Sequence, residues 1–190
     1  MTLSYSPLKT GFAFVPMDLA VMVGASGSSA LVPRIGPRIP IFIGLLLAAV
    51  GMVLLAQLEL TSSYAANILP GLVIVGFGIG LAVASALSAA TSGVGTEQSG
   101  VASAFVNVTQ QVGGAIGIAV LSAFAATAAS DYLEGKTPTP ANQAPAGLES
   151  YTTVFWWAAG IFAVGAVTCG ALLRSGPIET DPDAAPVVAH

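Results

Sequence analysis

Apolar residues in this chain are gathered into five long runs, which short polar or proline-rich segments separate. A helix needs about 20 apolar residues to cross a hydrocarbon core roughly 30 Å thick. The pattern therefore predicts an all-α integral membrane protein with five transmembrane helices. We expect these helices over residues 11–31, 41–58, 68–90, 101–126 and 151–173.

Composition strengthens this prediction and leaves little room for a soluble domain. Only 7% of the 190 residues are charged, whereas about 25% are charged in an average soluble domain. We expect residues 130–150 to form a loop and residues 175–190 to form a disordered tail. With one cysteine, Cys169, one terminal histidine, His190, and a net charge of −4, the sequence predicts no metal site, cofactor or nucleic-acid partner.

The basic residues predict how the helices are oriented in the membrane. Arg34 and Arg38 lie between the first two runs, and Arg174 follows the fifth, so five crossings place all three on one side. Lys9 and Lys136 fall on the other side. Because cytoplasmic loops favour Lys and Arg near helix ends, we expect a cytoplasmic C-terminus in the cell membrane.

Glycines in the third and fourth runs have the spacing of close helix packing. Small residues four apart let two helix backbones approach within lipid, where the hydrophobic drive between helices is missing. One interpretation is static contact within a helix bundle. The other is that these glycines let helices rock during a transport cycle. The candidate positions are Gly76, Gly80, Gly113, Gly114 and Gly117.

Amide side chains occur together inside the fourth run, at Asn107, Gln110 and Gln111. At a rise of 1.5 Å per residue, the glutamines lie roughly 14 Å from the start of that run, near the bilayer middle. An unpaired amide in hydrocarbon costs several kcal/mol. These residues are therefore expected either to clamp two helices by hydrogen bonds or to line a water-filled pathway.

Asp18 is the acidic residue within the predicted spans, in the first run and two residues after Pro16. Proline removes one helix hydrogen bond and loosens the turn before it. An ionisable group at membrane depth is by default a candidate functional site. Asp18 is thus a candidate proton or cation site, and the alternative is an acid in a wet outer vestibule.

The segment between the first two runs is very short and contains Arg34, Gly36 and Arg38 among prolines. Glycine permits a tight reversal of the chain, and the prolines restrict it. The arginines could reach carboxylates or helix C-termini at the cytoplasmic rim and act as a gate. They could equally serve as plain positive anchors, and the two roles are compatible.

This turn and two other segments carry a family resemblance. Residues 29–38 are similar to a degenerate second copy of a G-x-x-x-D-R-x-G-R-[KR] loop. Residues 107–117 are similar to an N-x-x-[RQ]-Q-x-G-G-A-x-G run, and residues 69–80 to the start of a late helix. On these residues the chain resembles the C-terminal part of a major facilitator superfamily transporter, most of all the fourteen-span drug:proton antiporters. The first loop departs from the pattern at Ser29, Pro33 and Pro37.

The resemblance implies that the five helices are most of the C-terminal bundle of such a transporter. It implies proton-coupled multidrug efflux by alternating access, with a small lipophilic or cationic substrate and the surrounding lipid as partners. The N-terminal half would then be missing, and the chain would be incompetent alone. Asn107, Gln110 and Gln111 would line the substrate pathway, and the Arg34–Arg38 turn would be the cytoplasmic gate.

Two other functions compete with transport. The first is a non-transporting small membrane protein that acts through helix–helix association. The second is an intramembrane enzyme, which needs a nucleophile or metal cluster at depth. The available groups, Asp18 and Cys169, lie in different runs and lack a histidine partner. The sequence therefore does not predict an enzyme.

Overall fold

The computed structural model describes residues 7–59, 63–92, 98–136, 139–173 and 176. These residues form five long helices, preceded in one case by a short π-helix, η1 (Tyr64–Ile68). All five are long and apolar enough to cross a membrane. The predicted all-α, multi-pass membrane fold is therefore confirmed. The helices are α1 (Pro7–Ile35), α2 (Arg38–Ala56), α3 (Leu69–Thr91), α4 (Ser99–Leu133) and α5 (Pro140–Leu172).

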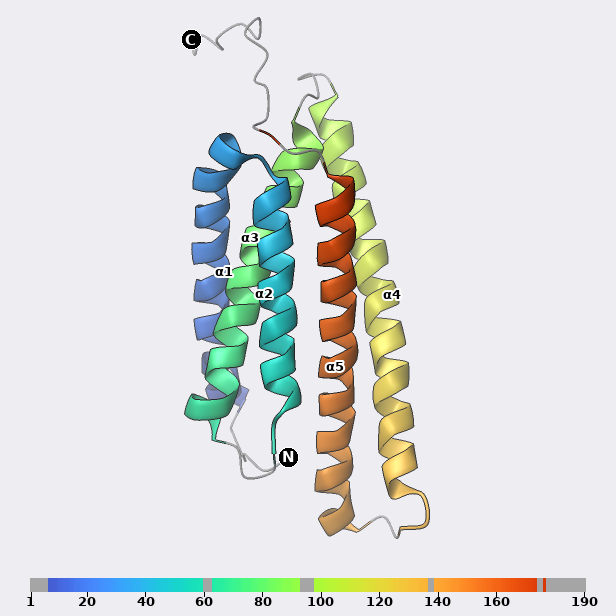
Figure 1. The fold of residues 1–190 in the computed structure, drawn as a ribbon. Coiled ribbons are helices and arrows are strands. Elements are labelled where there is room, and N and C mark those ends of the chain that lie inside the picture. Colours follow the sequence, from blue (N-terminus) through green and yellow to red (C-terminus); the bar gives the residue numbers. More distant parts are fainter. Residues whose placement is uncertain (1–6, 60–62, 93–97, 137–138, 174–175, 177–190) are drawn as a thin grey trace, which may run out of the picture.

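The order of the helices in space differs from their order in the chain (Figure 1). Helix α3 packs against α1 on one side and against α2 on the other, although α1 and α2 are consecutive. Helix α2 then packs on α5, and α5 packs on α4. The result is a row of helices, α1–α3–α2–α5–α4, whose best-buried contacts lie where α3 meets its two neighbours.

Small side chains make up much of the buried core. Ala48 and Ser85 have no exposed surface, and Val75 is only 1% exposed. Dispersion contacts between closely spaced helices replace the bulky core of a soluble domain, because lipid is as apolar as any side chain. Larger apolar side chains such as Phe12, Phe105 and Val164 project outward, as a lipid-facing surface requires.

Helix α1 continues through Pro16, whose missing N–H cannot bond the carbonyl of Phe12. One turn away, the hydroxyl of Tyr64 in η1 donates a hydrogen bond to the backbone carbonyl of Ala13. Neighbouring elements commonly satisfy backbone groups near a proline in this way within membranes. The contact fixes the start of α3 to the first half of α1.

The expected loop at residues 130–150 is wrong for most of its length. Helix α4 runs to Leu133 and α5 begins at Pro140, so only a short connection separates them. Gly135, with φ +71°, lies in this connection, and Pro140 stands in the first turn of α5, where its missing N–H costs nothing. Hydropathy does not report helix propensity, and α5 continues through Pro145 and Gly147, which are poor helix formers.

Helices α4 and α5 form a hairpin that is longer than the membrane is thick. Their 35 and 33 residues correspond to about 50 Å each, against about 28 Å for the 19 residues of α2. Figure 1 shows the tip of the hairpin extending past the other helices, at the end opposite to the α1–α2 turn. The tip therefore projects beyond a hydrocarbon core of about 30 Å.

Candidate functional site

The glycines of α3 bring its backbone against that of α1. A Cβ atom built at Gly80 would lie 2.1 Å from the carbonyl oxygen of Val21, and one at Gly76 would lie 2.5 Å from that of Met17. Gly24 of α1 meets the α3 backbone in the same manner. Only glycine fits at such separations, so these positions set how closely the two helices approach.

The opposite side of α3 has an equally close contact with α2. A Cβ at Gly78 would lie 2.5 Å from the carbonyl oxygen of Gly44, and one at Gly44 would lie 2.6 Å from that of Gly78. Further along the two helices, a Cβ at Gly51 would first meet the side chain of Val75, at 2.6 Å, and one at Gly71 the side chain of Leu55, at 2.7 Å. Helix α3 is thus held by close backbone contacts on both sides, and on the α2 side also by these two side chains.

A polar contact joins α1 to α3 near the end that carries the α1–α2 turn. The hydroxyls of Ser28 and Ser85 lie 2.7 Å apart and share a hydrogen bond, and both residues are almost completely buried. Sequence reasoning missed this pair because the serines lie in different runs. One signal was available: Ser28 lies four residues after Gly24, on the same helix face, so it could be expected to face the same neighbouring helix.

The amide residues of α4 lie on an exposed surface. Asn107, Gln110 and Gln111 are all exposed, and no residue of α4 whose burial is described is buried. The neighbouring Thr109 donates its hydroxyl to the carbonyl of Phe105 in its own helix, at 2.9 Å. No such hydrogen bond is made by the three amides, so the described part of the chain leaves them exposed and without a partner.

The glycines of α4 differ from those of α3 in their surroundings. No atom of the described chain outside their own helix backbone lies within 4 Å of a Cβ built at Gly113, Gly114 or Gly117. Their sequence spacing resembles that of Gly76 and Gly80, yet they make no helix contact here. A packing role for them stays a prediction and requires a helix beyond those described.

Asp18 lies on an exposed side of α1. Its neighbours Met17 and Val21 carry the carbonyls that meet α3, which turns the carboxylate away from that interface. The side chain makes no hydrogen bond or ion pair with another described residue. The structure thus leaves its role as a proton or cation site untested.

The α1–α2 turn is as short as the sequence predicts. Helix α1 ends at Ile35 and α2 begins at Arg38, and Gly36 adopts φ +78°, which favours glycine. A Cβ at Gly36 would lie 1.9 Å from the carbonyl oxygen of Gly176, beyond the end of α5. Arg34 is exposed and Arg38 is half-buried, so the turn presents one basic side chain fully to solvent.

Comparison with known proteins identifies the family of this chain. The model of the Major Facilitator Superfamily matches residues 1–118. The chain belongs to this superfamily. The match covers the glycine-rich α1–α3 and α2–α3 interfaces, the α1–α2 turn and the amides of α4, so every candidate site residue predicted from the sequence falls within the matched range.

Curated relatives support the assignment. The chain is 39% identical over 176 residues to the puromycin resistance protein pur8 of Streptomyces alboniger, covering 91% of this chain and 35% of that protein. It is 33% identical over 140 residues to the multidrug resistance protein Stp of Mycobacterium tuberculosis, covering 72% and 26%. It is 36% identical over 120 residues to the cephamycin export protein CmcT of Amycolatopsis lactamdurans, covering 63% and 25%. The chain spans about a third or less of each relative.

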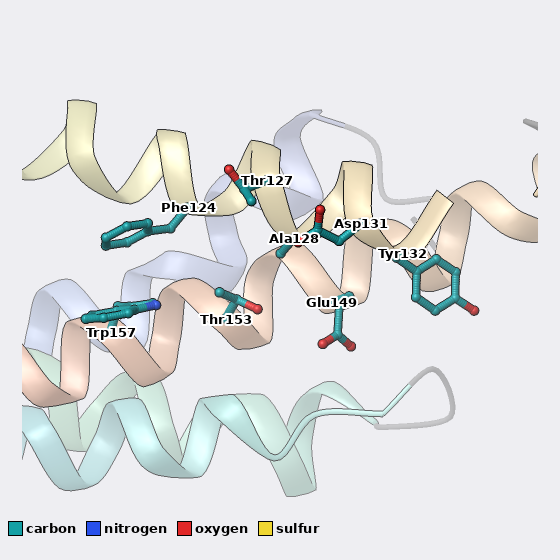
Figure 2. A pocket seen from close by; sticks show the side chains of 8 residues that line it. All are labelled: Phe124, Thr127, Ala128, Asp131, Tyr132, Glu149, Thr153 and Trp157. Carbon is teal, nitrogen blue, oxygen red and sulfur yellow. The ribbon is translucent and has the colours of Figure 1, made fainter. Parts of the chain in front are cut away.

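One further feature of this major facilitator chain was missed by sequence reasoning. Asp131 and Glu149 belong to the segment that was expected to form a loop; both are exposed, and both face a pocket between α4 and α5 (Figure 2). The two acids are 18 positions apart and come together because α4 and α5 run antiparallel. No sequence motif connects them, and only the length of the hairpin could have indicated the pairing.

Proposed function

We propose that this chain forms part of a secondary active transporter that exports small lipophilic or cationic compounds in exchange for protons. Three relatives that the chain resembles are named for puromycin resistance, multidrug resistance and cephamycin export. Efflux by alternating access fits a helix bundle of this superfamily. A non-transporting protein that acts only through helix association is not favoured, because it would not account for these relatives.

The observation that carries the proposal is the exposed amide group of α4. Asn107, Gln110 and Gln111 lie within a helix long and apolar enough to cross a membrane, and nothing in the described chain covers them. Such groups need a partner helix or a hydrated cavity. In transporters built from two bundles, the substrate site lies near the bilayer midplane between the halves. We assign these three residues to that site.

The rest of the pathway would come from helices that this chain does not span. The N-terminal half of the transporter would face the amide group, and Gly113, Gly114 and Gly117 would accept close packing of a further helix. The Arg34–Arg38 turn would gate the cytoplasmic side, with the C-terminus also cytoplasmic and the protein in the cell membrane. Asp18, on the exposed side of α1, is the candidate proton or cation site.

A chimera tests the proposal. The segment of the puromycin resistance protein that matches this chain would be replaced by this chain, and puromycin resistance would be measured in a sensitive host. We expect the chimera to confer resistance and this chain alone to confer none. Substituting Gln110→Ala and Gln111→Ala together should lower resistance at least tenfold at unchanged membrane abundance.

Thr109→Val provides the matched control, because Thr109 lies in the same polar run but satisfies its hydroxyl within its own helix. It should leave resistance near the level of the unmodified chimera. Equal loss from both sets of substitutions would contradict a pathway role for the amides. A chimera that reaches the membrane intact but confers no resistance would contradict the proposed function itself.

A further inference from the structure

The tip of the α4–α5 hairpin contains a pocket that the proposed transport pathway does not use. The pocket has a volume of about 390 Å³ and lies between the two helices. Figure 2 shows aromatic rings at one end, Tyr132 at the other end, and Asp131 and Glu149 between them. The remaining lining is small or weakly polar and comes from Thr127, Ala128 and Thr153.

Two stacked aromatic rings form the inner end of the pocket. Phe124 of α4 and Trp157 of α5 have ring centroids 4.5 Å apart and planes inclined by 25°. Trp157 is nevertheless 51% exposed, so part of its ring remains available to another molecule. Tryptophan settles at the boundary between headgroups and hydrocarbon, which places this end of the pocket at the membrane surface.

Two carboxylates lie nearer the hairpin tip. Asp131 and Glu149 are exposed, and neither carboxylate makes a hydrogen bond or ion pair with another residue in the described ranges. Both line the pocket. A cation in the pocket would therefore meet two acceptors that no protein group already occupies.

An ammonium group of the chain itself lies next to the outer end of the pocket. The Nζ atom of Lys136 lies 3.5 Å from the centroid of the Tyr132 ring, and Tyr132 lines the pocket. An ammonium over an aromatic face is attracted by the negative face of the ring. One face of the Tyr132 ring thus already contacts a positively charged nitrogen, although Lys136 itself does not line the pocket.

The spacing of these groups defines the shape of a ligand. Seven residues of α4 separate Phe124 from Asp131, and eight residues of α5 separate Glu149 from Trp157. At 1.5 Å per residue, the aromatic end and the acidic part lie roughly 10–12 Å apart along the helices. A ligand spanning both parts needs an apolar ring at one end and a positive charge about that far away.

We propose that this pocket binds amphipathic organic cations, with an aromatic group on Phe124 and Trp157 and an ammonium between Asp131 and Glu149. The ring inserts at the membrane surface, and the charge stays on the aqueous side. The site is separate from the amide group of α4, and its binding activity stands whether or not the chain takes part in export.

A ligand series tests the proposal on the unaltered full chain in phosphatidylcholine nanodiscs. Isothermal titration calorimetry would compare 6-phenylhexan-1-amine, whose extended length matches the pocket, with benzylamine and with 6-phenylhexan-1-ol. Empty nanodiscs provide the heat of partitioning into lipid. We expect the long amine to bind at least tenfold more tightly than either of the others. Equal affinity for the alcohol or for benzylamine would overturn the proposal.

Matched variants locate the binding site. Asp131→Asn and Glu149→Gln should each weaken binding of the long amine about fivefold, whereas Glu134→Gln should not, since Glu134 lies on the same tip outside the pocket lining. Trp157→Leu should weaken binding to a similar extent, and the adjacent, equally exposed Trp156→Leu should not. Equal losses within either pair would overturn the assignment to this pocket.

A substitution at Lys136 should strengthen binding of the long amine, whereas the substitutions of pocket residues above should weaken it. Lys136→Gln removes the positive charge that lies over Tyr132, next to the acidic part of the pocket, and so removes its repulsion of a bound ammonium. We expect binding of the long amine to become about threefold tighter. Unchanged or weaker binding would contradict the placement of the ligand's ammonium at this end of the pocket, and circular dichroism would verify that each variant keeps its helix content.

Discussion

The three helices α1, α3 and α2 and the two helices α4 and α5 are held together in different ways. In the first group, glycines let backbones touch, as Gly80 does against Val21. In the second group, the rings of Phe124 and Trp157 stack across the helix interface, and no atom of a neighbouring helix lies close to Gly113, Gly114 or Gly117 of α4. The same small-residue spacing therefore indicates that a second helix could pack closely at that face. It does not indicate that such a helix is present.

The pockets of the two groups also differ in their lining. The pocket between α1, α2 and α3 is lined by apolar side chains, among them Leu19, Leu47 and Phe77. The pocket beside the ring stack also has the two carboxylates Asp131 and Glu149 in its lining. The two groups of helices therefore offer surfaces of different chemistry.

The largest expected effect comes from placing a methyl group into each kind of glycine site. Gly80→Ala should lower the free energy of unfolding by about 3 kcal/mol, the upper range for overpacking, because its Cβ would meet a backbone carbonyl that cannot move aside. Gly113→Ala should raise the free energy by about 0.5–1 kcal/mol, since alanine favours helix and nothing obstructs it. Reversible unfolding in mixed dodecyl sulfate micelles measures both.

A destabilising Gly113→Ala in the isolated chain would contradict the comparison. The same substitution in a chimera with the puromycin resistance protein offers a sharper version. If a further helix packs on α4 at Gly113 in the chimera, Gly113→Ala should lower the stability of the chimera instead of raising it.

A smaller effect is expected from the ring stack. A double-mutant cycle with Phe124→Leu and Trp157→Leu should give a coupling energy of about 1 kcal/mol, because the stacked rings interact directly. The matched cycle pairs Phe124→Leu with Trp156→Leu, and Trp156 makes no stack with Phe124 among the described contacts. Coupling of equal size in both cycles would show that the stack does not hold α4 to α5.

The smallest effect concerns the buried hydroxyl pair. Ser85→Ala should cost about 0.6 kcal/mol of unfolding free energy, the average for interhelical hydrogen bonds in membranes, because Ser28 loses its partner across the interface. Ser26→Ala is the control, since the Ser26 hydroxyl is exposed and bonds the carbonyl of Met22 in its own helix. A cost well above 2 kcal/mol would mean that the pair, and not the glycines, determines the α1–α3 contact.

The fold was largely predictable from hydropathy, and the site only in part. Five runs correctly predicted five helices, and the spacing of Gly36 between two arginines correctly predicted a tight turn. Helix ends beyond the membrane were not predictable, because polar helix-forming residues up to Leu133 resemble a loop when only hydropathy is considered. The pairing of Asp131 with Glu149 depends on that unpredicted length.

Contacts across helices were predictable only where a spacing rule exists. Gly76 and Gly80 follow such a rule and do meet α1. Gly113 and Gly117 follow it equally and meet nothing in the described chain. The partner of a helix face is decided by which other helices are present, and that information is spread over the whole protein.

The position of α3 between α1 and α2 has a consequence for how the protein is made. Helices α1 and α2 leave the ribosome before α3 and are joined by a turn that brings their ends together. They contact each other only slightly, because the space between them belongs to α3. The newly inserted pair must therefore stay open in the bilayer until the third helix arrives, and its glycine faces stay without their partners during that interval.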